Sequence, residues 1–183
     1  MLDKCWAKLS LLLTFVSFVL LIVGLSSPVW LSRNGHYEGI WIYCYYLIHT
    51  QGDIKCLVLD KLADFSVTGN WLKAVRALMI LSVIATFVST VCHILYIVAR
   101  RRSVGLKLLH TAIILASLSA ILCVSGLIIY ATRVRIDILK EDYVIGWSFI
   151  LCAVGGGVMA GVILPLLVEI KNCRLLASYE TIT

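Results

Sequence analysis

Four long, almost uncharged apolar stretches constrain this chain more than any other feature of its sequence. A helix needs about 20 apolar residues to cross the hydrocarbon core of a bilayer. The chain is 61% hydrophobic, well above the roughly 45–50% of soluble domains. We therefore predict a single membrane domain, 1–183, whose transmembrane helices run over 9–29, 72–98, 108–131 and 144–168.

The spans leave two unequal connections, 30–71 and 132–143, on one side of the membrane. The other side carries basic residues with few acidic residues among them: Lys4, Lys8, Arg100, Arg101, Arg102, Lys107, Lys171 and Arg174. By the positive-inside rule, both termini are expected in the cytoplasm and both connections outside the cell. The net charge of +6 is then a topology signal, and we expect no nucleic-acid partner. A cleaved signal peptide is the alternative for the first span.

The long connection carries a strand pattern and two cysteines. Residues 37–48 are rich in aromatic and β-branched side chains, 51–53 form a turn signal, and 54–59 suit a returning strand. Cys44 and Cys56 fall on the two arms of this hairpin and are the only cysteines placed outside. A disulfide between them would stabilise the fold by about 3 kcal/mol. Two free thiols are the alternative.

Tyr45, Tyr46, Leu47 and Ile48 give the hairpin an apolar tip or edge. Such an edge can pair with another strand and is a candidate adhesion surface. Packing on the bilayer surface or on the short outer connection is the alternative. Among the other cysteines, Cys5 and Cys173 lie at the inner membrane boundary and are candidate palmitoylation sites.

Small residues mark two helix faces. Ala153, Gly157 and Gly161 form a GxxxG-type stripe on the fourth span, and Ala112, Ala116 and Ala120 form a similar stripe on the third. Small residues let helices approach closely in lipid, so we expect these residues to pack inside the bundle. For the GxxxG stripe, a dimer face is the alternative. Pro165 is expected to kink or end the fourth helix.

No residue pattern indicates an enzyme. The spans contain no acidic residue before Glu169, and His93 and His110 lie near inner helix ends. No phosphate-binding or dinucleotide motif is present, and His36, His49, Cys44 and Cys56 match no zinc spacing. We expect no catalytic site, metal, cofactor or small-molecule substrate.

The loop residues resemble the signature of a known superfamily. The loop is similar to the W-GLW-C-C motif of the claudins, peripheral myelin proteins and epithelial membrane proteins. The matching residues are, in order, Trp30, Gly39-Ile40-Trp41, Cys44 and Cys56, with Ile40 replacing the usual leucine. Arg76 matches the arginine that opens the claudin second helix. The resemblance implies a claudin-like, all-α membrane protein, with a left-handed four-helix transmembrane bundle and a small disulfide-linked extracellular β-sheet.

In this resemblance the two tryptophans and Arg76 hold the loop. Trp30 and Trp41 are amphipathic rings suited to the membrane interface, and Trp41 would pin the hairpin to the outer helix ends. Arg76 would hydrogen-bond the loop backbone or pair with a loop acid. A snorkelling arginine is the alternative for Arg76.

The function expected from the resemblance is structural. We expect a plasma-membrane protein of cell–cell junctions, in contact with membrane lipid and assembling with itself or related four-span proteins in one membrane and across two. The short Trp30–Trp41 spacing is more typical of the peripheral myelin branch. A membrane-organising or trafficking protein and an auxiliary channel subunit are therefore the alternatives.

Overall fold

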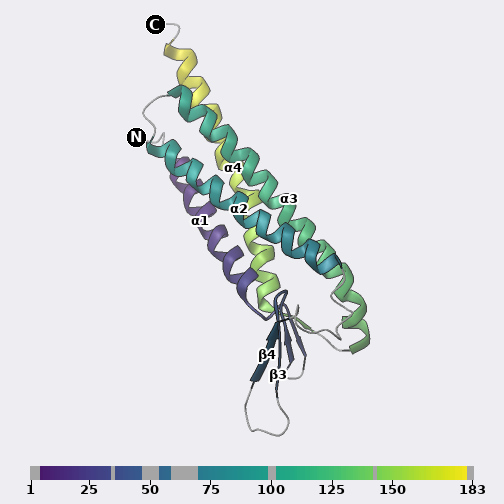
Figure 1. The fold of residues 1–183 in the computed structure, drawn as a ribbon. Coiled ribbons are helices and arrows are strands. Elements are labelled where there is room, and N and C mark those ends of the chain that lie inside the picture. Colours follow the sequence, from purple (N-terminus) through teal and green to yellow (C-terminus); the bar gives the residue numbers. More distant parts are fainter. Residues whose placement is uncertain are drawn as a thin grey trace.

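The computed structural model describes residues 5–33, 36–46, 54–58, 70–98, 102–141 and 144–180. Four helices form a bundle, with a small sheet at one end and both chain ends toward the other (Figure 1). The helices are α1 (Cys5–Ser26), α2 (Asn70–Val98), α3 (Arg102–Glu141) and α4 (Trp147–Glu180). All four are long and apolar enough to cross a membrane, which confirms the predicted four-span architecture.

The helices pack as a ring in which α1 contacts α2 and α4, and α3 contacts α2 and α4. Hydroxyl groups connect α2 to α3 inside this ring. Thr86 Oγ1 lies 2.6 Å from Ser119 Oγ, and Ser89 Oγ donates to the carbonyl oxygen of Ala112 at 3.1 Å. The predicted small stripe of α3 is buried on this inner face, with side chains of Ala112, Ala116 and Ala120. Small residues and hydroxyl pairs hold helices together where lipid supplies no hydrophobic drive between them.

The outer faces of the helices are apolar. Exposed side chains include Phe15, Leu81, Ile114, Ile121 and Leu164. A water-soluble bundle would carry polar residues at such positions, whereas in a bilayer they contact lipid.

Two helices run further than the hydropathy predicted. Helix α3 continues to Glu141, so most of the predicted connection 132–143 is helical. Helix α4 begins at Trp147 rather than 144, passes through Pro165 and reaches Glu180. The helix therefore does not end near that proline, and a kink there stays a prediction. Hydropathy marks only the part of a helix that lies in lipid, and a membrane helix tolerates an internal proline because neighbouring groups satisfy the freed carbonyl.

The sheet has five short antiparallel strands in the order β4-β3-β2-β1-β5. They are β1 (Leu31–Arg33), β2 (His36–Glu38), β3 (Ile42–Tyr46), β4 (Ile54–Val58) and β5 (Val144–Ile145). The predicted hairpin is present as β3 and β4. The expected single strand over 37–48 is instead two strands, β2 and β3, separated by the Gly39-Ile40-Trp41 turn. Strand β5 was expected to be the start of the fourth helix. It instead pairs with β1, so the chain just before α4 is joined to the chain just after α1.

Candidate functional site at the sheet–bundle junction

The disulfide joins the two strands of the predicted hairpin. Cys44 in β3 lies directly opposite Cys56 in β4, and their sulfur atoms are bonded. Both sulfurs are therefore unavailable as zinc ligands. Within the ranges that the structure describes, no group of three or more metal-ligating side chains is present.

Trp30 attaches the start of the sheet to the end of α1. Its side chain is fully buried, and its indole Nε1 donates to the carbonyl oxygen of Gly24 at 2.9 Å. The ring packs edge-on against Tyr130 and Phe149, with centroids 4.9 and 5.9 Å away. Trp30 is therefore packed within the protein and presents no surface to the lipid headgroups. The chain folds back after α1, so the indole fills the end of the bundle core instead.

Trp41 makes a parallel contact one residue further along α1. Its Nε1 donates to the carbonyl oxygen of Leu25 at 3.0 Å. The last carbonyl groups of a helix have no intrahelical partner, and an unsatisfied buried carbonyl is costly. Trp30 and Trp41 thus cap two successive carbonyls at the end of α1, which ties the sheet to that helix.

Arg76 ties the same turn to α2. Its side chain is buried, and Nε donates to the carbonyl oxygen of Ile40 at 2.7 Å. Its guanidinium carbon lies 5.0 Å from the centroid of the Trp41 ring, in a cation–π contact. A snorkelling arginine would be exposed, so this geometry fits the anchoring role that the sequence suggested.

The turn between β2 and β3 has little space for side chains. A Cβ atom on Gly39 would lie 2.7 Å from the Cα of Pro28, closer than real Cβ atoms approach. Ile40 is fully buried in the core cluster at this end of the bundle. Glycine and a large aliphatic residue at these two positions therefore let the turn lie directly on the helix ends.

The sequence located the free edge of the sheet on the wrong strand. Tyr45 and Tyr46 belong to β3, which pairs with β2 on one side and β4 on the other. Leu47 and Ile48 lie outside the described residues. Among the described strands, β4 is the last on this side of the sheet, and all five of its side chains are exposed, including Ile54, Leu57 and Val58. An interior strand has no backbone groups left for another chain, so β4 is the candidate adhesion edge.

The GxxxG stripe does not pack inside the bundle, which corrects that prediction. Ala153, Gly157 and Gly161 are exposed, and a Cβ atom at either glycine would meet nothing within 4 Å. The neighbouring glycines make the contacts instead. A Cβ on Gly156 would lie 2.8 Å from Cys123 Sγ, and one on Gly155 would lie 3.1 Å from Leu21. Successive helical residues are about 100° apart, so a shift of one residue moves the face from the core to the lipid.

Sequence reasoning missed a polar cluster at the end of the bundle away from the sheet. Glu169 is 1% exposed, and its Oε1 accepts a hydrogen bond from Tyr96 Oη at 2.7 Å. Cys173 is half-buried with its sulfur 3.4 Å from the same hydroxyl, and His93 is buried with Nδ1 near the carbonyl of Ser89. The rarity of ionisable residues within membrane helices was the available signal for Glu169. The side chain of Cys5 lies outside the described part, so palmitoylation at Cys5 and Cys173 stays a prediction.

The family model described as PMP-22/EMP/MP20/Claudin matches residues 8–164, which include the second and third spans, most of the first and fourth, and all five described strands. A search of curated proteins found no match.

Proposed function

Because this chain belongs to the PMP-22/EMP/MP20/Claudin family, we propose that it is a non-enzymatic structural protein of cell–cell contacts in the plasma membrane. It assembles laterally in one membrane and meets a neighbouring cell through its sheet, as a junction or barrier component. The observation that carries the proposal is the β4 edge, an exposed, partly apolar strand on a sheet that is fastened to the bundle. A rigid edge loses little entropy on pairing, which favours adhesion.

The proposed orientation places the sheet outside the cell and both termini in the cytoplasm. Lys8, Lys107 and Lys171 lie toward the helix ends away from the sheet. Basic residues accumulate on the cytoplasmic side of membrane proteins. A disulfide between Cys44 and Cys56 also agrees with an oxidising, extracellular location for the sheet.

The direct test of the proposed function uses mixed cultures of cells that normally lack junctions. We expect a fluorescently tagged protein to accumulate where two expressing cells touch, because pairing across the gap needs an edge on each cell. It should not accumulate where an expressing cell touches a non-expressing one. Even distribution over the whole surface, with no accumulation at contacts, would refute the adhesion proposal.

Lateral assembly is supported by the outward GxxxG stripe, and two neighbouring substitutions test it. Gly157→Leu should leave the free energy of unfolding within about 0.5 kcal/mol, because the new side chain enters open space. It should reduce self-association in the membrane, because the close helix approach is lost. Gly156→Leu is the contrasting variant and should destabilise the monomer by about 1–3 kcal/mol, because it collides with Cys123.

Fluorescence energy transfer between differently tagged copies gives the association, and thermal unfolding in detergent gives the stability. If Gly157→Leu associates as well as the unmodified chain, the stripe is not the lateral interface.

A second candidate function is membrane organisation or trafficking, as in the peripheral myelin and epithelial membrane branch. The short spacing between Trp30 and Trp41 favours it. An auxiliary channel subunit is a further alternative. Even surface distribution together with specific recovery of a channel in a pull-down would support the channel role, and even distribution alone would support the membrane-organising one.

A further inference from the structure

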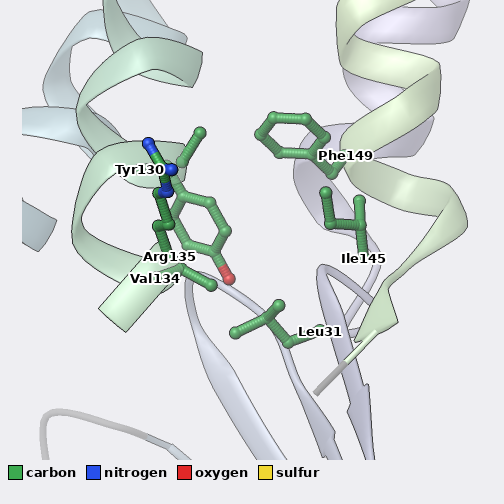
Figure 2. A pocket seen from close by; sticks show the side chains of 7 residues that line it. Leu31, Tyr130, Val134, Arg135, Ile145 and Phe149 are labelled. Carbon is green, nitrogen blue, oxygen red and sulfur yellow. The ribbon is translucent and has the colours of Figure 1, made fainter. Parts of the chain in front are cut away.

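An apolar pocket opens beside the sheet–bundle junction, and two of its lining residues, Tyr130 and Phe149, also pack against Trp30. Its volume is about 170 Å³. Figure 2 shows Tyr130 and Val134 of α3 facing Phe149 of α4 and Ile145 of β5 across it, with Leu31 of β1 below. Ala131 and Ile145 are exposed, so the pocket opens to the surface of the molecule.

The pocket lies at the boundary of the membrane. The apolar span of α3 ends at Arg135, and that of α4 begins at Trp147. Trp147 is 49% exposed, as expected for a tryptophan at the level of the lipid headgroups. A molecule that enters this pocket from the surface therefore comes from the upper acyl region of the adjoining leaflet.

The lining and size restrict the occupant to a short length of hydrocarbon chain. The lining is almost entirely apolar. An engineered apolar cavity of about 150 Å³ in another protein binds benzene, so a volume of this order holds roughly six carbon atoms. The fused ring system of a sterol is several times larger than benzene and does not fit.

A positive charge at the rim adds a headgroup preference. Arg135 lines the pocket, is exposed, and lies at the end of the apolar span. A guanidinium binds phosphate through paired N–H groups, and arginine is suited to this at interfaces. The distance between a lipid phosphate and its upper methylene groups is short, so one molecule can contact both the charge and the pocket.

We propose that this pocket is a binding site for a glycerophospholipid of the adjoining leaflet, with an upper acyl segment among Tyr130, Val134 and Phe149 and the phosphate on Arg135. Such a lipid fills the gap between α3 and α4 next to β5. The proposal does not depend on the function at cell contacts, since it concerns only the membrane face of the protein.

Photo-crosslinking of the full-length protein in liposomes tests the site. The probe is a phosphatidylcholine with a diazirine in the upper part of one acyl chain, and a photoreactive sterol is used in parallel. After digestion, mass spectrometry locates the labelled residues. We expect the phospholipid to label the pocket residues above an exposed position at similar depth on α3, Ile128, which does not line the pocket, and the sterol not to do so.

Two variants and a control make the test specific. Ala131→Phe fills the pocket from its rim and should abolish the excess labelling. Arg135→Gln should lower it about fivefold, because the loss of one hydrogen bond from the guanidinium to the lipid phosphate weakens binding by about that factor. Arg133→Gln is the matched control, because Arg133 is exposed on the same helix and does not line the pocket. For each variant, an intact Cys44–Cys56 disulfide and an unchanged midpoint of thermal unfolding show that the protein is folded.

The outcomes separate clearly. Labelling in proportion to exposure, preferential labelling by the sterol, or equal labelling of Arg135→Gln and Arg133→Gln would each overturn the proposal. If Ala131→Phe fails to fold, the comparison of the two arginine variants decides.

Discussion

Replacing Arg76 with methionine is expected to lower the free energy of unfolding by about 3 kcal/mol or more. The substitution keeps an unbranched apolar stem but removes the donor to the carbonyl of Ile40. Leaving a buried carbonyl unsatisfied costs about 1–3 kcal/mol, and loss of a desolvated cation–π contact with Trp41 costs about 2 kcal/mol. The sheet should then detach from α2 while the helices remain.

The control for this prediction is Lys73→Met, one turn earlier on α2. Lys73 is exposed, so the same loss of charge should change stability by no more than about 0.5 kcal/mol. Arg76→Lys should be intermediate, because an ammonium lacks the planar fork and stacks less well. Thermal unfolding in detergent and the fraction delivered to the cell surface are the measurements. Equal midpoints for Arg76→Met and Lys73→Met would show that Arg76 is not an anchor.

The membrane spans were predictable because lipid imposes one simple requirement. Each helix must carry about 20 apolar residues, and that signal is visible without any knowledge of packing. The same signal failed at the helix ends. Beyond Ala131 in α3 and beyond Val168 in α4, charged and polar residues interrupt the apolar run. Both helices nevertheless continue, because Arg, Lys, Leu and Glu are good helix formers outside the membrane as well.

The sheet was predictable only in part, for reasons of length. The β3–β4 hairpin has two five-residue strands with an aromatic and β-branched pattern, and this was sufficient. Strand β5 has only two residues, and no periodicity exists over so short a segment. Its pairing with β1 depends on Gly146, where a Cβ atom would collide with the carbonyl of Val29. Such close approach is a tertiary property.

The anchoring residues were identifiable from the sequence, but their partners were not. A tryptophan in a membrane protein suits both the interface and the core, and the burial of Trp30 depends on Tyr130 and Phe149, which come from distant parts of the chain. The face of the glycine stripe was ambiguous for a similar reason. Three successive glycines, 155–157, point in different directions around α4, and only the position of Leu21 and Cys123 identifies which of them are buried.

The largest functional effect is expected from a charge on the β4 edge. Leu57→Lys places an ammonium on an exposed strand, which is a device that natural proteins use to prevent edge-to-edge pairing. Because the side chain is exposed, folding and surface delivery should be unaffected. Accumulation between two expressing cells should fall to the level of a freely diffusing membrane marker.

The opposite edge of the same sheet supplies the control. Val144 in β5 is 65% exposed, and Val144→Lys makes a comparable change without touching β4. If strand pairing through β4 causes adhesion, this variant should accumulate at contacts like the unmodified protein. Retention of accumulation by Leu57→Lys would exclude β4 as the adhesive edge. Loss of accumulation in both variants would contradict adhesion through β4 alone. It would instead indicate a general effect of added charge on the sheet, because β5 lies at the opposite end of the strand order from β4.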